Sequence, residues 1–171
     1  MQSSAAPGAA AGYGIAFVPT TAADLAYVLA VERHPDNAPY IGQWSQAEHQ
    51  AAIDSPNDRH WLIRAADQTV GYLIASGVGS PHNILNLTRL VVTVKGQGYG
   101  RAALRLLKHY AFIQCGLHRL QLDVKCNNPR AYGLYLSEGF VKEGEMRESF
   151  KTASGYVGRY LLAMLAQEYQ G

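Results

Sequence analysis

The sequence has few cysteines, little excess charge and no histidine pair suited to a metal. Its two cysteines, Cys115 and Cys126, lack metal-binding spacing, and its six histidines form no HExxH motif. We therefore expect no metal, and we interpret both cysteines as small core residues, with a structural disulfide as the alternative. The net charge of +2 comes from scattered Lys and Arg residues, without the basic clusters typical of nucleic-acid-binding proteins.

The sequence also lacks a membrane-spanning run and a recognisable secretory signal. No stretch of about 20 apolar residues is present. Residues 1–14 do not show the basic and then apolar order of a signal peptide. We therefore expect a cytoplasmic protein without a membrane partner. Residues 1–13 are rich in Ala, Gly and Ser, which predicts a tail that is disordered or was added by cloning and carries no function.

The rest of the chain contains enough apolar residues for one core. A hydrophobic content of 48% over 171 residues predicts a single domain, which we place at residues 14–171. The patterns predict a strand, two helices, a three-strand meander, a helix, a strand, a helix and a closing hairpin. This order is typical of an α/β (α+β) domain with a mixed sheet and helices on both of its faces. The predicted strands cover residues 15–19, 60–65, 70–78, 90–94, 120–125, 141–150 and 155–164.

Local signals bound the first two helices and characterise one later strand. Thr20 or Thr21 caps the first helix, and Ser45 with Glu48 makes a capping box for the second. Residues 120–125 alternate between apolar and polar side chains, so this strand has one face that is polar or lies in a cleft. A right-handed crossover makes this strand parallel to the one predicted to end at residue 94.

The stretch from residue 87 to residue 107 combines a strand, a glycine turn and a helix. An apolar, mostly β-branched run at residues 90–94 is followed by glycines at positions 96, 98 and 100 and then by a helical pattern. Alternate glycines let successive backbone N–H groups converge on an anion. The first turn of the helix adds unpaired N–H groups and the positive end of its dipole, and Arg101 adds a full charge. The predicted ligand is a pyrophosphate or phosphate group.

Two common phosphate-binding loops do not match this stretch. A Walker loop ends in Gly-Lys-Ser or Gly-Lys-Thr, whereas Gly100 is followed by Arg101 and Ala102. A dinucleotide fingerprint has the spacing GxGxxG, whereas GQGYG has the spacing GxGxG. Residues 95–100, KGQGYG, closely resemble the acyl-CoA loop of the GNAT superfamily of N-acyltransferases, usually written Gln/Arg-x-x-Gly-x-Gly/Ala. Lys95 stands where the family prefers Gln or Arg.

A second motif, NNPRAYGLYLSEGF, strengthens this resemblance. GNAT enzymes have an Asn after the fifth strand, then a helix with Leu-Tyr and then Gly-Phe, which are Asn128, Leu134-Tyr135 and Gly139-Phe140 here. The C-terminal part looks most like the branch of ribosomal-protein N-terminal and spermidine acetyltransferases. The resemblance implies the GNAT fold, a single mixed, mostly antiparallel sheet with a central, splayed parallel strand pair and helices on both faces.

The resemblance implies direct transfer of an acetyl group from acetyl-CoA to a primary amine, which is a small molecule or a protein N-terminus. No metal and no covalent enzyme intermediate are expected. Main-chain groups near Leu90 and Val92, with the Asn128 side chain, would hold the pantetheine. The residues of the pyrophosphate turn would be Lys95, Gln97, Gly98, Tyr99, Gly100 and Arg101.

The resemblance also implies acid and base groups. Tyr135 occupies the general-acid position, although a core tyrosine on an amphipathic helix would look the same. Asp123 aligns with a glutamate that serves as the base in some relatives, and a surface or ion-pair role is its alternative. Glu32 is the second candidate for the base, and water is the third.

Several residues have plainer interpretations. Asn128 before Pro129 looks like a helix N-cap whether or not it binds a ligand. We expect packing or surface roles for Arg89 and His82.

Other classes of function stay open. A non-catalytic acyl-CoA-binding regulator would keep the loop but lose the tyrosine, and a thiol acyl-carrier enzyme would use Cys126 as its nucleophile. The acceptor is open among polyamines, amino acids, antibiotic amines and protein N-termini, because residues 35–44 and 149–156 would select it. The closing hairpin often supports dimers in this family, so a homodimer is expected.

Overall fold

The structure, a computed structural model, describes residues 14–171, so the predicted tail at residues 1–13 lies outside the described residues. The helices are α1 (Leu25–Arg33), α2 (Gln46–Asp54), α3 (Tyr99–His109) and α4 (Pro129–Ser137), with short turns η1 (Ala22–Asp24), η2 (Tyr110–Gln114) and η3 (Ala166–Glu168). The strands are β1 (Ala16–Pro19), β2 (Asp58–Ala65), β3 (Gln68–Ser76), β4 (Ile84–Val92), β5 (Arg119–Lys125), β6 (Val141–Thr152) and β7 (Gly155–Leu165). This is the predicted order of elements.

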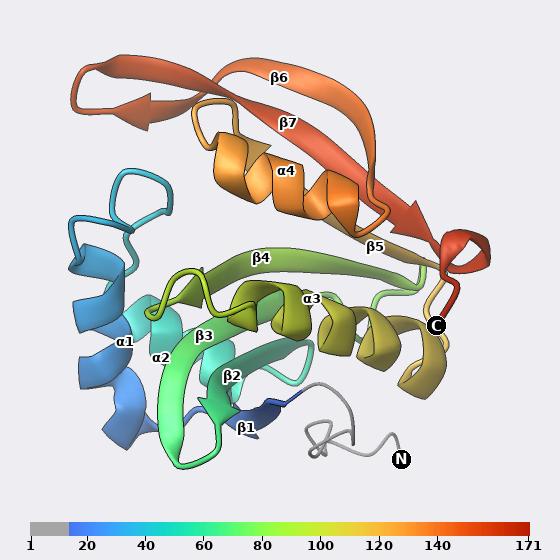
Figure 1. Cartoon of the computed structure of the whole chain (residues 1–171). Helices are drawn as coiled ribbons and strands as arrows, with labels where there is room; N and C mark the ends of the chain where they lie inside the picture. Colours follow the sequence, from blue (N-terminus) through green and yellow to red (C-terminus); the bar gives the residue numbers. More distant parts are fainter. Residues whose placement is uncertain (1–13) are drawn as a thin grey trace.

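These strands form one seven-stranded sheet in the order β1-β2-β3-β4-β5-β7-β6 (Figure 1). The neighbours β4 and β5 run parallel, and the other neighbouring strands run antiparallel. The predicted mixed, mostly antiparallel sheet with a central parallel pair is therefore confirmed. No helix within residues 14–171 is long and apolar enough to cross a membrane.

Capping side chains set the starts of the first two helices. The Glu48 carboxylate accepts from the backbone N–H of Ser45 at 2.7 Å, and Ser45 Oγ accepts from the N–H of Glu48 at 3.3 Å, so the predicted capping box is present. Thr21 and Asp24 cap the turn before α1, with the Thr21 N–H donating to Asp24 at 2.8 Å. Thr20, the other predicted cap, is instead buried beside β2.

Apolar side chains from β2 point alternately to the two faces of the sheet. Trp61 and Ile63 pack in the core cluster that contains the apolar residues of α3, whereas Leu62 packs in the cluster that contains Val28 and Val31 of α1 and residues of β3 and β4. Helix α2 lies on the same face as α1, because His49 of α2 contacts the rings of His60 and Tyr72. The prediction of helices on both faces is therefore confirmed.

Strand β4 ends at Val92 and not at Val94, the end predicted from the apolar run. The Val94 side chain is 41% exposed. Lys95 donates to the carbonyl oxygen of Val92 at 2.7 Å, and Gly96 has a φ of +81°, so the chain turns out of the sheet directly after Val92. The apolar run predicted the wrong strand end because Lys95 and Gly96, and not a loss of apolar character, make the turn.

The parallel strands β4 and β5 separate halfway along their length. Their pairing runs from Ile84 with Arg119 to Leu87 with Leu122 and then stops. A β-bulge in the pairing of β3 with β4 leaves Thr88 as an extra residue, since Leu87 pairs with Ala75 and Arg89 pairs with Ile74. The splayed pair implied by the family resemblance is therefore present.

The bulge decides which side chains of β4 face each side of the opening. Side chains alternate along a strand, so one extra residue exchanges the two faces beyond it. After Thr88, Leu90 and Val92 lie on the α3/α4 face, whereas Arg89 and Val91 lie on the α1/α2 face. Without the bulge, Arg89 would point into the apolar layer under α3.

Candidate active site

Two cavities meet at the opening between β4 and β5. The first, of about 480 Å³, lies between the glycine loop and the start of α4. The second, of about 580 Å³, lies along β5, the middle of β4, parts of β6 and β7 and the loop before α2. Leu90, Asn128 and Tyr135 line both cavities. A molecule that spans the sheet through this opening would pass beside Tyr135.

The glycine loop forms one end of the first cavity. Gly96 and Gly98 have φ values of +81° and +79°, in the left-handed region that glycine tolerates. A Cβ added at either position would meet no other atom within 4 Å, so the space in front of the loop is open. Gly98 is also the N-cap of α3, whose first residues Tyr99 and Gly100 line the cavity. An open loop at a helix N-terminus has the geometry of a phosphate site.

Lys95 and Arg101, both predicted to bind CoA, lie beside this loop and already have partners. Lys95 Nζ donates to Asn37 Oδ1 at 2.8 Å as well as to Val92, so it holds the loop after α1 against the end of β4. Burial lowers the pKa of Lys95, and the nearby charge of Arg130 lowers it further. Arg101 Nη1 donates to Glu138 at 2.5 Å and lines the first cavity.

Glu138 joins α3 to α4 through three cations. Its carboxylate accepts from Arg101, Arg105 and Lys108. Burial raises the pKa of Glu138, but the hydrogen bonds from these cations outweigh it and lower the pKa to about 2. Of these three cations, Arg101 lines the first cavity, and its positive charge beside the glycine loop favours an anionic ligand there.

Asn128 is the N-cap of α4, as the sequence predicted. Its Oδ1 accepts from the N–H of Ala131 at 3.1 Å, and Pro129 occupies the first helical position. The Asn128 side chain lines both cavities, so its position is compatible with a contact to pantetheine. That contact stays a prediction.

Tyr135 is 8% exposed and lies on α4 where the cavities meet. Its ring packs edge-on against Phe140, with ring centroids 5.9 Å apart. Burial raises the pKa of the Tyr135 hydroxyl, and the negative charge of Asp123 raises it further. Within residues 14–171, the hydroxyl makes no hydrogen bond to another residue. It is therefore a protonated donor facing the opening.

The polar face of β5 lines the second cavity. Gln121, Asp123 and Lys125 alternate along the strand and all contribute to the wall, so the predicted polar or cleft face is confirmed. Asp123 Oδ2 accepts from Arg159 Nη1 at 3.0 Å, which is the ion pair that the sequence left open. A role of Asp123 as the base stays a prediction.

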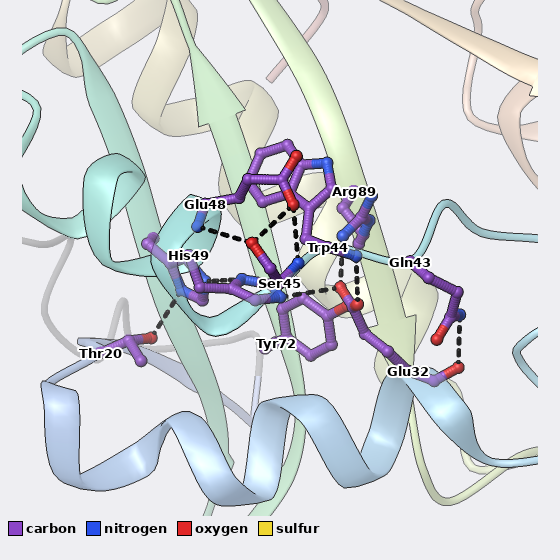
Figure 2. Close-up of polar contacts among 10 residues, drawn as sticks. Thr20, Glu32, Gln43, Trp44, Ser45, Glu48, His49, Tyr72 and Arg89 are labelled. Atoms are coloured by element: carbon purple, nitrogen blue, oxygen red, sulfur yellow. Dashed lines mark hydrogen bonds and ion pairs between the residues drawn. The ribbon is translucent and has the colours of Figure 1, made fainter.

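Glu32, the second candidate for the base, is 1% exposed and is not part of either cavity wall. Figure 2 shows its carboxylate surrounded by donors. It accepts from the Tyr72 hydroxyl at 2.7 Å, from the Trp44 N–H at 3.1 Å and from Arg89. His49 Nε2 lies 3.1 Å from the same carboxylate. Direct contact with an acceptor amine does not fit this burial, and in the structure Glu32 holds Arg89 in place.

Sequence reasoning missed this buried network and the role of Arg89 in it. Arg89 lines the second cavity and lies over the Trp44 ring at 4.6 Å, so it is more than a packing or surface residue. The network continues from His49 to His60 and then to Thr20, with contacts of 2.9 Å at each step. Its partners are separated by up to 57 residues, so no local pattern could have found them.

The remaining candidates lie elsewhere or show no ligand geometry. His82 is exposed, as expected, and does not line the two cavities. Cys126 also lies outside both walls, next to Gly158, which leaves the thiol route without support from its position. Both cysteines are free, so the disulfide alternative is wrong. Within residues 14–171, no group of three His, Cys, Asp or Glu side chains could hold a metal.

Comparisons with known proteins agree with this geometry. The profile of the acetyltransferase (GNAT) family matches residues 27–140. Spermidine N(1)-acetyltransferase from Vibrio cholerae is 32% identical over 75 residues, which are 44% of this chain and 43% of that protein. The chain thus matches less than half the length of this curated relative.

Solved structures show the same fold. The crystal structure of spermidine N-acetyltransferase from Vibrio cholerae in complex with CoA and spermine superimposes with a TM-score of 0.83 and 19% identity, covering 92% of this chain and 99% of that one. A chimera of the Vibrio cholerae enzyme gives a TM-score of 0.82 at 20% identity, with coverages of 91% and 98%. With both motifs inside the matched segment, the chain belongs to the acetyltransferase (GNAT) family.

Proposed function

We propose that the chain is an N-acetyltransferase that moves an acetyl group from acetyl-CoA directly to a primary amine. The meeting of the two cavities at Tyr135 is the observation that carries this proposal. One cavity ends in an open glycine loop suited to phosphates, and the other is polar and has the Asp123 carboxylate in its wall. Family membership and the acetyltransferase names of the relatives support the same activity.

The first cavity would hold acetyl-CoA. The turn from Gln97 to Arg101 would bind the pyrophosphate through its backbone N–H groups and the positive charge of Arg101. Main-chain groups at Leu90 and Val92, which pair with β3 but no longer with β5, would hold the pantetheine together with Asn128. Lys95 would support acetyl-CoA binding indirectly, because it fixes the loop after α1 against the end of β4, beside the glycine turn.

In the second cavity, the neutral amine would attack the acetyl carbonyl carbon at the opening. A C–N bond forms, the tetrahedral intermediate collapses, and the C–S bond breaks to release the CoA thiolate. Tyr135 would donate its proton to the sulfur and then regain one from solvent, while the attacking nitrogen releases its extra proton to solvent, so that the products are a neutral amide and the CoA thiol. The raised pKa of Tyr135 keeps the phenol protonated at neutral pH, so it can donate a hydrogen bond to the developing thiolate.

The ammonium form of the amine must lose a proton before attack. We propose Asp123 as the group that takes it, directly or through a water molecule, because its carboxylate lines the acceptor cavity and acts electrostatically on Tyr135. Arg159 would fix the orientation of the carboxylate.

Two measurements test the proposal. Acetyl-CoA should stabilise the fold by about 2.7 kcal/mol at a hundredfold excess over its dissociation constant. Release of the CoA thiol should then be followed over a panel of amines and peptides. Stabilisation without turnover on any amine would instead favour a non-catalytic acyl-CoA-binding module. We also propose a cytoplasmic location and a homodimer that forms through the β6–β7 hairpin.

A further inference from the structure

We infer that the acceptor is an amine that also carries a carboxylate or another anionic group, and that polyamines are poor acceptors. The inference rests on the proposed function and names the substrate class of the same site. It is carried by the charge balance of the second cavity and by the position of Lys125 in its wall.

The wall of the second cavity holds more cations than carboxylates. Its charged side chains are Arg89, Arg119, Lys125 and Arg159, opposed by Asp123 and Glu143. The buried carboxylate of Glu32 balances Arg89 from behind the wall. A surplus of positive charge therefore remains, and such a surface repels a ligand with several ammonium groups.

Both carboxylates of the wall are already paired with guanidinium groups. Glu143 accepts from Nη1 and Nη2 of Arg119 at 2.8 and 2.5 Å, and Asp123 accepts from Arg159 at 3.0 Å. A polyamine could reach either carboxylate only by displacing its arginine. Because the displaced guanidinium would stay in the same cavity, the positive charge facing the polyamine would not fall.

Lys125 is the cation of this wall without a carboxylate partner. Within residues 14–171, no carboxylate oxygen lies within 4.0 Å of its Nζ. The Nζ donates to the carbonyl oxygen of Pro39 at 3.0 Å and lies 3.6 Å from the centroid of the Phe150 ring. An ammonium group has three donors, so it retains hydrogen-bonding capacity for an anion.

The surroundings of Lys125 favour a negative ligand. Burial lowers the pKa of Lys125, and the charges of Arg159 and Arg89 lower it further. A bound anion would offset both effects, because it replaces lost solvation and opposes the neighbouring charges.

The position of Lys125 also limits the size of the acceptor. It follows Asp123 by two residues on β5, so both side chains point to the same face about 7 Å apart. An acceptor with its amine near Asp123 and Tyr135 would reach Lys125 with an anion only a few bonds away. Amino acids, short ω-amino acids and peptides with a nearby carboxylate share this chemistry.

The first arm of the test uses the wild-type protein. We would measure kcat/KM for free amino acids, ω-amino acids and short acidic peptides, each beside its amide, and for spermidine and spermine. The free carboxylates should exceed their amides by about tenfold or more, the usual effect of a hydrogen bond to a charged group. Comparison of free amino acids with peptides identifies the source of the anion.

The second arm removes the charge. Lys125→Met keeps the length and apolar stem of the side chain, and kcat/KM for the carboxylate-bearing amines should fall by about tenfold or more with little change for their amides. Lys151→Met is the matched control, because Lys151 is exposed on β6 and lies outside both cavity walls. Unchanged stabilisation by acetyl-CoA would show that Lys125→Met is folded.

The outcomes separate the two proposals. If polyamines are turned over with higher kcat/KM than every carboxylate-bearing amine, or if each amide equals its acid, the inference is wrong and the N-acetyltransferase activity stands. If the protein binds acetyl-CoA but acetylates no amine, the proposed function fails and the inference fails with it. The wild-type comparison decides the matter even if Lys125→Met does not fold.

Discussion

Arg89 on β4 donates to the buried carboxylate of Glu32 on α1, although 57 residues separate them in the sequence. The contact ties the wall of the acceptor cavity to the helix layer behind it. It exists because the bulge at Thr88 turns Arg89 toward α1, where Trp44 covers the guanidinium at 4.6 Å. A charge pair in the core thus positions one wall of the second cavity.

Replacing Glu32 by Gln should destabilise the fold and disturb acceptor binding. The change leaves Arg89 buried without a carboxylate, and loss of one partner of a buried pair costs about 3 kcal/mol. We expect a higher KM for the acceptor and little change in the KM for acetyl-CoA. Urea unfolding and steady-state kinetics measure both effects. Glu145→Gln, from an exposed pair with Lys142, should stay within about 1 kcal/mol, and a Glu32→Gln protein as stable as this control would contradict the positioning role.

Gly98→Val should abolish binding of acetyl-CoA. The valine side chain would enter the open space in front of the loop, where the phosphates are proposed to lie. Valine at a φ of +79° also strains the backbone, so Gly116→Val, at a φ of +60° and outside both cavities, is the matched control. Calorimetry should show binding to the control but not to Gly98→Val. Normal binding by Gly98→Val would show that the loop does not hold CoA.

Asp123→Asn keeps the shape of the side chain and removes its charge. If Asp123 takes the amine proton, the acidic limb of kcat/KM against pH should shift or disappear, with little change in the KM for acetyl-CoA. Asp67→Asn, in the exposed turn between β2 and β3, should keep the wild-type profile. A wild-type profile for Asp123→Asn as well would assign the deprotonation to water.

Stability should fall in mildly acidic solution because of His60. Burial, together with the charges of His49 and Arg89, lowers its pKa to about 4. The unfolded chain takes up this proton near the ordinary pKa of about 6.5, so stability present above that pH is lost as the pH falls toward 4. We expect a loss of about 2 kcal/mol between about pH 7.5 and about pH 5.

Urea unfolding at these two pH values measures this loss. Glu138, with a pKa of about 2, contributes little above pH 5 and does not obscure the effect. His60→Gln should reduce the pH dependence whatever it costs at neutral pH, and part of the dependence that remains belongs to His49, whose pKa burial also lowers. Equal stability of the wild-type protein at both pH values would show that His60 is not held in its neutral form.

Local patterns predicted the features that depend on neighbouring residues. The capping box of Ser45 and Glu48, the glycine loop and the polar face of β5 all follow from spacings of two to four residues. The order of the elements along the chain followed from the same patterns, and the crossover rule added the parallel strand pair. The family resemblance then added the splayed strand pair.

The sequence did not reveal features that arise only when distant segments meet. The bulge at Thr88 depends on how β3 pairs with β4, and the burial of Glu32 depends on donors from several elements. Lys125 was recognised as part of the polar face, but the absence of a nearby carboxylate is a property of the described fold. Side chains that act across the sheet therefore need the structure.

Tyr135→Phe tests most directly the claim that the two cavities meet at a proton donor. The change keeps the ring and its packing on Phe140 and removes only the hydroxyl. Tyr132→Phe is the matched control, because Tyr132 lies on the same helix but outside both cavity walls. The measurement is turnover with acetyl-CoA in excess, together with acetyl-CoA affinity by calorimetry.

We expect Tyr135→Phe to bind acetyl-CoA normally and to turn over at least about a hundredfold more slowly than the wild type, the usual contribution of one positioned acid. Tyr132→Phe should keep the wild-type rate. Such a loss in turnover without a loss in binding marks an interaction made in the transition state. If Tyr135→Phe turns over within about threefold of the wild type, with amine attack or a later step shown to limit the rate, Tyr135 is a core residue and the central claim is contradicted.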